Sequence, residues 1–342
     1  MRELVEALCS DECGGRAPGT PGGRRARQLV VEAFREAGLD PFEQEVSWCK
    51  GANVLATVNP EAERFVIVGA HFDHLGTIGG KIYRGADDNA AAVAILVEAA
   101  RGLVKDAPEK RGVIVAAFDA EESPYFGTPA MGSQLFATRP TVPLDRVDMM
   151  VCMDLVGHAF GPEGVPGEVR ESLFALGGER SRGTEALVSS MSRAEPGLVV
   201  RPVDVEIVPP LSDYLSFWRR GVPFLFLSSG RSRVYHTVDD TPEHLDFARM
   251  AATARWLEGY VRASCERPEE RVDFLKGARA DRTTLRALVE ITGSLSAVSE
   301  EAAQARAMCE SLLGECDSEG RLPGPQRDGI AALVQMLEHR LS

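Results

Sequence analysis

The hydrophobic residues of the chain fall into two patterns, short continuous runs and longer stretches with helical spacing. Four runs are almost wholly apolar and mostly rich in Val, Ile and Phe: Phe65–Ala70, Val113–Phe118, Met149–Met153 and Val222–Leu227. Runs of this length and composition are typical of strands in a parallel sheet, which is buried on both faces. We therefore expect these four segments to be strands of such a sheet.

Segments with helical spacing of apolar residues lie before, between and after these runs. The first is 22–37, in which Ala26, Val30 and Phe34 recur at helical spacing and which ends at Gly38. The others are 90–104, 184–193 and 244–262. This alternation of strands and helices predicts an α/β fold, with an open, mostly parallel twisted sheet sandwiched by helices and right-handed crossovers.

The character of the chain changes after Arg262. The sequence ERPEER is charged and interrupted by proline, and residues 280–342 contain no strand-like run. Helical spacing returns there, for example at Leu285 and Leu288 and again from Ile330 onward. We place a boundary near residue 267 and expect a main domain and a helical C-terminal appendage, at 1–266 and 267–342.

Composition limits the classes of function. The chain has 342 residues with 44% hydrophobic content, enough for a sizeable core, and a formal net charge of −13. Binding to nucleic acid or to an anionic membrane needs a basic surface, so we expect neither partner. The N-terminus has no long apolar segment and no run of about 18 apolar residues occurs, which favours a cytoplasmic protein.

The cysteines are odd in number and form no C-x-x-C pair. They are Cys9, Cys13, Cys49, Cys152, Cys265, Cys309 and Cys316. This pattern disfavours both a disulfide scaffold and a zinc site made of thiolates. We expect reduced thiols, while a pairing of Cys9 with Cys13 or of Cys309 with Cys316 stays open.

Acidic and imidazole side chains follow each apolar run. In chain order they are His71, Asp73 and His74 after the first run, Asp119, Glu121 and Glu122 after the second, Asp154 after the third, and Tyr235 and His236 past a short loop after the fourth. Asp87 and Asp88 precede the alanine-rich helix at 90–104.

Each of these features alone has an ordinary explanation. A pair of glutamates is usually solvated, and Asp87 and Asp88 suit the N-cap of a helix. However, ligands of open parallel sheets bind outside the carboxyl ends of the strands, where all these side chains would converge. Imidazole and carboxylate without thiolate are the ligands of Zn²⁺ and similar metals. The joint pattern therefore predicts a metal site at this edge.

Five motifs carry a family resemblance. HFDHLG, GADDNAA, DAEES, MDLVG and YHTVDDT resemble, in order, the signatures of the di-zinc aminopeptidases, which include aminopeptidase Y and the bacterial leucyl aminopeptidases. Glutamate carboxypeptidase II and the glutaminyl cyclases are more distant relatives. The resemblance runs from about residue 14, in GGRAPGTPGG, to about 262 and does not cover 267–342. It implies that 1–266 is a zinc exopeptidase catalytic domain.

The resemblance implies a site for two Zn²⁺ ions, although other divalent metals suit such ligands. His71 and Asp154 would hold one ion, and Glu122 and His236 the other. Asp88 would bridge both, which is chemically sensible because two cations about 3.5–4 Å apart need a shared anionic ligand.

The same resemblance implies three residues that assist the reaction. Glu121, the neighbour of the metal ligand Glu122, would be the general base. Asp73 would orient the imidazole of His71, as carboxylates commonly do for metal-bound histidines. Tyr235 would stabilise the oxyanion.

The implied activity is that of an aminopeptidase, which hydrolyses the N-terminal residues of small peptides. Arg201, Arg219 and Arg220, near the cleft elements, keep a carboxypeptidase or dipeptidase open. A glutaminyl-cyclase-like acyltransferase would run on one zinc, and the complete H-x-D element at His71 argues against it. A binding module without activity would have lost ligands or the base, and none is missing.

Three features depart from the family pattern or lie outside it. The loop SPYFGTPAMGS after Glu122 is longer than usual and is expected to border the substrate cleft. The element SDYLSF at 212–217 has Tyr214 where the family has histidine. No ligand role is implied for His74.

Overall fold

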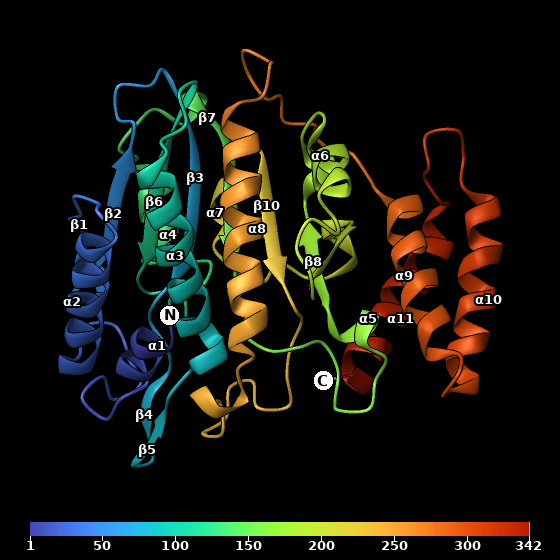
Figure 1. The fold of residues 1–342 in the computed structure, drawn as a ribbon, viewed down its shortest axis with the longest axis horizontal. Coiled ribbons are helices and arrows are strands. Elements are labelled where there is room, and N and C mark those ends of the chain that lie inside the picture. Colours follow the sequence, from blue (N-terminus) through green and yellow to red (C-terminus); the bar gives the residue numbers. More distant parts are fainter. Residues whose placement is uncertain (342) are drawn as a thin grey trace.

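An eight-stranded sheet forms the centre of the molecule in a computed structural model that describes residues 1–341 (Figure 1). The strand order is β1-β2-β6-β3-β7-β10-β8-β9. The strands are β1 (Phe42–Val46), β2 (Gly51–Val58), β3 (Arg64–His71), β6 (Arg111–Phe118), β7 (Val147–Met153), β8 (Ser172–Leu176), β9 (Val199–Val203) and β10 (Phe224–Ser228). A separate hairpin consists of β4 (Gly76–Ile78) and β5 (Lys81–Tyr83).

The four strands predicted from the apolar runs are neighbours in this sheet. They lie in the order β6-β3-β7-β10 and pair in parallel, which confirms the expected fold class. The outer strands were not predicted. β2 is antiparallel to β6, β1 is antiparallel to β2, and β8 is antiparallel to β10, so the sheet is mixed at both edges.

Helices cover both faces of the sheet (Figure 1). The apolar side chains of α1, α2, α3 and α8 pack on one face, and those of α4 and α7 pack on the other. Their bounds are α1 (Arg2–Leu8), α2 (Pro21–Glu36), α3 (Ala91–Lys105), α4 (Gly132–Thr138), α5 (Gly167–Arg170), α6 (Thr184–Ser190), α7 (Tyr214–Trp218) and α8 (Phe247–Cys265).

Local capping explains where two predicted helices begin. The hydroxyl of Thr20 accepts a hydrogen bond from Gly23 N–H, and Pro21 occupies the first position of α2, which suits its fixed φ. The carboxylate of Asp246 accepts from Arg249 N–H, so α8 begins at Phe247 rather than at 244 as predicted. Among the described residues, no helix is both long and apolar enough to cross a membrane. All seven cysteines are free thiols.

Three C-terminal helices lie beside the β9 edge of the sheet, at the right of Figure 1: α9 (Asp281–Leu295), α10 (Glu300–Glu315) and α11 (Gly324–Leu341). They share a small apolar cluster that includes Leu285, Cys309 and Ile330. In addition, Ala287 of α9 belongs to the main core and Leu341 packs in one cluster with Phe160. The C-terminal helices are therefore confirmed, and the division into two domains near 267 stays a prediction.

A buried ionic network joins α11 to the sheet. The guanidinium of Arg327 lies 2.8 Å from Asp204 Oδ1, 3.0 Å from Glu206 Oε2 and 3.1 Å from Asp281 Oδ1. Asp204 and Asp281 are almost completely buried. Because burying a carboxylate without a partner is unfavourable, Arg327 stabilises the docking of these helices, together with Arg279, which also pairs with Asp281.

We predict that Arg327→Met lowers the free energy of unfolding by about 3 kcal/mol, because it leaves the buried carboxylate of Asp204 without its ion-pair partner. Urea unfolding of wild type and variant measures this difference. The control is Arg321→Met, whose partner Asp317 and own side chain are about half exposed, and which should leave the free energy of unfolding nearly unchanged. Equal losses in the two variants would contradict the role given to Arg327.

Another buried carboxylate, that of Glu179, makes the free energy of unfolding depend on pH. Burial and the charge of Asp204 raise the pKa of Glu179 to about 8, whereas an unfolded glutamate has a pKa of about 4.3. Between these values the folded chain keeps a proton that the unfolded chain has lost. The contribution of Glu179 to stability must therefore decrease as the pH rises from about 5 to about 8.

We predict that Glu179→Gln removes this part of the pH dependence. Unfolding free energies at pH 5.5 and 8.5, the chosen test conditions, should differ less in the variant than in wild type. The exposed Glu300→Gln is the control and should keep the wild-type difference. A Glu179→Gln profile parallel to that of wild type would contradict the assignment.

Candidate metal centre and active site

The strand order brings the predicted residues to one edge of the sheet. His71 is the last residue of β3, and β3 lies between β6 and β7. Glu121 and Glu122 come shortly after β6, and Asp154 comes directly after β7. Because these strands are parallel, their carboxyl ends meet, as the sequence predicted.

Asp88 reaches the same edge from a short helical turn, η2 (Ala86–Ala90), directly before α3. Its backbone is not helical, with φ −110° and ψ 85°. The carboxylate of Asp240 accepts hydrogen bonds from the N–H groups of Asp87 and Asp88, at 2.8 and 3.1 Å. The main chain of this turn is thus fixed by another segment of the site.

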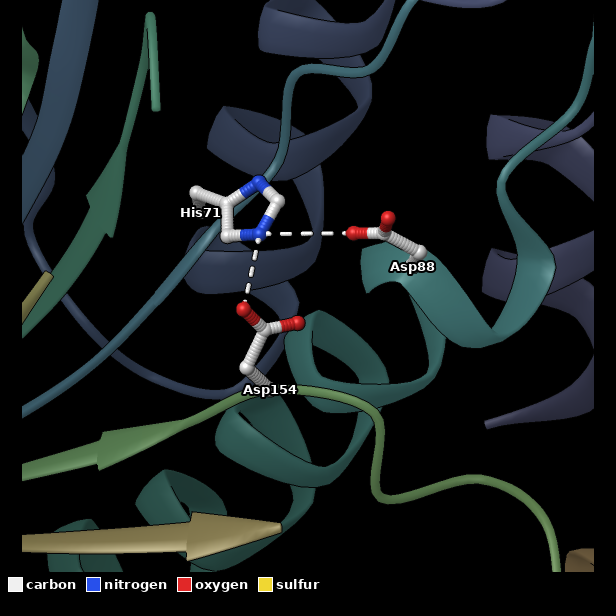
Figure 2. Close-up of side chains that lie close together, drawn as sticks. All are labelled: His71, Asp88 and Asp154. Atoms are coloured by element: carbon white, nitrogen blue, oxygen red, sulfur yellow. Dashed lines mark ion pairs between the residues drawn. The ribbon is translucent and has the colours of Figure 1, made fainter. Parts of the chain in front are cut away.

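One potential metal cluster consists of His71, Asp88 and Asp154 (Figure 2). Nε2 of His71 lies 3.5 Å from Asp88 Oδ1 and 3.6 Å from Asp154 Oδ2. All three residues are buried. Figure 2 shows the imidazole, from the end of β3, facing a carboxylate from the turn before α3 and another from the loop after β7.

The spacing of this cluster fits a metal ion. Ligand atoms about 2.1 Å from a tetrahedral ion lie about 3.4 Å from one another. Moreover, His71 Nε2 and Asp154 Oδ1 are buried and have no hydrogen-bond partner among residues 1–341. A bound cation would satisfy both atoms, which would otherwise be unfavourable in this position.

A second potential cluster consists of His74, Asp88 and Glu122, so Asp88 is common to both. His236 approaches the same carboxylates, with Nε2 at 3.0 Å from Asp88 Oδ2 and 3.4 Å from Glu122 Oε2. The structure therefore brings together all five predicted ligands, namely His71, Asp88, Glu122, Asp154 and His236.

His74 is a member of the site that the sequence interpretation did not assign. Its Nδ1 lies 2.8 Å from Glu122 Oε1, while His236 faces the other oxygen, Oε2. His74 is buried, whereas the side chain of His236 is 35% exposed. The motif HFDH, in which His74 directly follows Asp73, placed this histidine at the correct edge of the sheet but did not indicate its contact with Glu122.

Asp73 lies where the resemblance implied, with Oδ1 at 3.5 Å from Nδ1 of His71. It also accepts hydrogen bonds from the N–H groups of Glu121 and Glu122, at 3.0 and 3.1 Å. One buried carboxylate thus contacts both the first imidazole and the backbone of the two glutamates. Glu121 Oε2 lies 3.9 Å from His71 Nε2, so the proposed base faces the first cluster.

Burial and mutual repulsion control the protonation of the carboxylates. Burial, together with the charge of Glu122, raises the pKa of Asp88 to about 7. Burial also raises the pKa of Glu121 well above its usual value. Burial opposes the ionisation of Glu122 as well, but hydrogen bonds with His236 and His74 hold its pKa below the usual range.

The pKa values of two imidazoles in the site are also raised, although burial alone would lower them. Although burial lowers the pKa of a histidine, Glu121 and Asp154 raise that of His71 well above its usual value. Hydrogen bonds to Asp88 and Glu122 likewise outweigh burial and raise the pKa of His236 to about 10. Positive charge is therefore strongly favoured at this edge, which is the condition for binding divalent cations.

Tyr235 lies beside the second cluster. Its ring stacks on that of His236 with 3.9 Å between the centroids. Burial and the negative charge of Asp88 raise the pKa of its hydroxyl, so it remains a hydrogen-bond donor at neutral pH. The guanidinium of Arg231 lies 5.3 Å from the centre of the Tyr235 ring.

Asp213 is a further buried carboxylate near the site. It belongs to the element SDYLSF, and burial raises its pKa to about 7, while the charge of His71 acts in the opposite direction. The sequence interpretation noted this element only for the replacement at Tyr214. Tyr214 in fact packs in the core, stacked on Phe224 and Phe226.

Two of the three arginines that left a carboxypeptidase as an alternative bind other residues of the chain. Arg201 is buried and bonds to Ser172 and Glu290. Arg220 donates to Gln134, to Thr138 and to a main-chain carbonyl. These contacts occupy two of the three guanidinium groups that the sequence had suggested for a substrate carboxylate.

Comparison with known proteins identifies the family. The sequence matches the model of peptidase family M28 over residues 53–261. The chain belongs to peptidase family M28. This result confirms the resemblance and covers the segments that carry all five predicted metal ligands.

The relatives of this M28 chain include an uncharacterized protein and glutaminyl-peptide cyclotransferases. It is 27% identical to the uncharacterized protein YfbL of Escherichia coli K12 over 256 residues, 66% of this chain and 76% of YfbL. It is also 27% identical to the glutaminyl-peptide cyclotransferase of Boiga dendrophila over 294 residues, 72% of this chain and 76% of that protein.

A solved structure shares the fold of this M28 chain. The LapA aminopeptidase of Legionella pneumophila superimposes with a TM-score of 0.63 at 16% identity, covering 78% of this chain and 72% of LapA. At this identity the similarity establishes the fold alone. The chain is an M28 enzyme by family, and the comparisons include both aminopeptidases and glutaminyl cyclases.

We predict that Asp88→Asn removes both bound ions, because it takes away the ligand that the two clusters share. Asp154→Asn should remove only one ion. Metal content per chain, measured by mass spectrometry after dialysis, gives the stoichiometry. The control is the exposed-site variant His244→Gln, which should keep the wild-type content. Two ions per chain in Asp88→Asn would refute the bridging role.

Proposed function

We propose that this M28 chain is a di-zinc metallo-exopeptidase, and specifically an aminopeptidase that releases N-terminal residues from small peptides. The observation that carries the proposal is the pair of clusters that share Asp88, the first of which has its complete set of His71, Asp88 and Asp154. Imidazole and carboxylate ligands around a shared carboxylate are the arrangement expected for two ions.

Zinc, when bound, would supply Lewis acidity that polarises the peptide carbonyl and acidifies the attacking water. His71, Asp88 and Asp154 would hold one ion. Glu122 and His236, with Asp88, would hold the other. His74 keeps Glu122 in position through its contact with Oε1, so that Oε2 remains free for the metal.

Glu121 is the proposed general base. It lies at the first cluster without being one of the three ligands there, and Asp73 fixes its main chain. Burial raises its pKa above that of an ordinary glutamate, which makes the ionised carboxylate a stronger base. Glu121 would take a proton from the attacking water and give it to the leaving amine.

Tyr235 is the proposed donor to the oxyanion. Its hydroxyl keeps its proton at neutral pH, and its ring is fixed against His236. A hydrogen bond from this hydroxyl would stabilise the negative charge that develops on the carbonyl oxygen. Asp73, which contacts His71 at 3.5 Å, would keep that imidazole in the orientation needed for a ligand.

Glutaminyl cyclisation is the second candidate, because relatives of comparable identity are named glutaminyl-peptide cyclotransferases. Cyclase chemistry in this fold uses one zinc ion. The presence of His71 beside Asp88 and Asp154 favours two ions and hence hydrolysis. A panel of leucine anilide, an N-acylated peptide and a peptide with N-terminal glutamine would distinguish aminopeptidase, other exopeptidase and cyclase.

We predict that Glu121→Gln lowers kcat for leucine anilide by about 10³-fold, in the range expected for loss of a general base. Zinc content should be unchanged, because Glu121 is not a ligand in this proposal. Glu61→Gln, an exposed substitution, is the control and should keep wild-type activity. Near-normal turnover by Glu121→Gln with two zinc ions bound would rule out this mechanism.

A further inference from the structure

Arg16 is a buried cation that the proposed reaction does not use. It lies in the Gly/Pro-rich loop before α2, upstream of the region matched by the family model, and its exposure is 0%. It donates five hydrogen bonds within residues 1–341, and all five acceptors are main-chain carbonyl oxygens. Among these residues, no carboxylate accepts a hydrogen bond from the guanidinium.

The acceptors belong to the two segments that carry the first metal cluster. Nε donates to the carbonyl of Phe72, which lies between His71 and Asp73, at 2.8 Å. Nη2 donates to the carbonyls of Gly85 and Asp88, at 2.8 and 3.4 Å. One side chain therefore connects the loop after β3 with the turn before α3.

The remaining two bonds anchor Arg16 in its surroundings. Nη1 donates to the carbonyls of Leu8, at the end of α1, and of Arg84, beside Gly85. A guanidinium carries five N–H groups in a fixed planar fork, which here corresponds to the number of hydrogen bonds made. Lysine has three donors around one point and cannot reproduce this geometry.

The turn that carries Asp88 is held from two sides. Arg16 binds its carbonyl groups, while Asp240 binds the N–H groups of Asp87 and Asp88. Such opposed contacts fix the main chain of the turn and thereby the direction of the Asp88 carboxylate. The carboxylates of the cluster repel one another, and these contacts oppose a movement of the turn away from β3.

The backbone conformation of the loop around Arg16 determines where this side chain lies. Arg16 has a left-handed backbone with φ +58°, and Gly15 has φ +79°. A Cβ on Gly15 would lie 2.4 Å from the carbonyl oxygen of Gly76. The close approach of this loop to the segment after His74 therefore requires glycine at that position.

We propose that Arg16 is a positioning residue for the metal centre, which holds His71 and Asp88 at ligand distance by binding the main chain of both segments. This inference rests on the proposed metal site but not on the reaction, since a peptidase and a cyclase both need a metal. It predicts an effect on metal affinity that is separate from any effect on folding.

The test is the zinc dissociation constant of Arg16→Gly, measured by competition with a chromophoric chelator. Glycine tolerates the left-handed backbone and leaves a space the size of a guanidinium group. We expect a loss of affinity of about 10–100-fold, as for other residues that orient metal ligands. Millimolar guanidinium chloride should restore affinity in this variant and leave that of wild type unchanged.

The matched control is Arg84→Ala. The guanidinium of Arg84 bonds to the Cys9 carbonyl and to Asp11, and so contacts neither metal-bearing segment. This variant should bind zinc as wild type does. Thermal unfolding of the metal-free proteins is measured as well, to check that every chain is folded when the zinc affinities are compared.

Four results would contradict the positioning role or the proposed function, and they can be told apart. Unchanged zinc affinity in folded Arg16→Gly, or reduced affinity that guanidinium does not restore, would overturn the positioning role alone. If Arg16→Gly does not fold, Arg16→Lys replaces it, and wild-type affinity in that variant would be equally decisive against the role. Wild-type protein that takes up no zinc would instead refute the proposed function.

Discussion

Negative charge gathered at the carboxyl ends of β3, β6 and β7 is the constraint on which the site depends. Asp88, Glu121, Glu122 and Asp154 are all buried there. Carboxylates in such proximity cannot all ionise without nearby cations, which is why the pKa of Asp88 rises to about 7 through burial and the charge of Glu122. The edge must therefore hold protons, imidazolium groups or metal ions, and its chemistry follows from which of these is present.

The protein counters this repulsion by fixing the main chain rather than by pairing each carboxylate. Asp73 binds the N–H groups of Glu121 and Glu122, and Asp240 binds those of the turn with Asp88. Arg16 binds carbonyl groups on both sides of the first cluster. Contacts to the main chain leave the carboxylate oxygens free, so the side chains remain available as ligands while their positions are set.

The central strands, and the meeting of the predicted site residues at one edge of the sheet, were predictable because each signal is local, whereas the ligand roles of these residues came from the family resemblance. A continuous apolar run identifies a buried strand, and the polar residue that follows it must lie at the edge of the sheet. The outer strands carry weaker signals: β1, with the sequence FEQEV, is largely exposed, and β2 contains Gly51 and Asn53. Their pairing depends on neighbours far along the chain, which a single sequence does not reveal.

Contacts between distant residues explain what the sequence interpretation missed. His74 acts through Glu122, which is 48 positions away, and Arg327 joins α11 to Asp204 of the main body. Nothing in the local pattern separates His74 from an ordinary loop histidine. Likewise, the apolar stripes of α9 and α11 predicted helices but gave no partner, because both the apolar cluster with Phe160 and the ion pairs of Arg327 join residues that are far apart in the sequence.

The presence of a cation in the first cluster would change the ionisation of Glu121. Burial holds the pKa of this carboxyl group well above its usual value, whereas the charge of His71 acts in the opposite direction. A divalent cation held by His71, Asp88 and Asp154 would favour the ionised form, since Glu121 lies 3.9 Å from His71 Nε2. A cation in the first cluster would thus keep more of Glu121 in the ionised form, which can accept a proton. Attack by water requires such an acceptor, so the proposed role of Glu121 depends on an occupied cluster around His71.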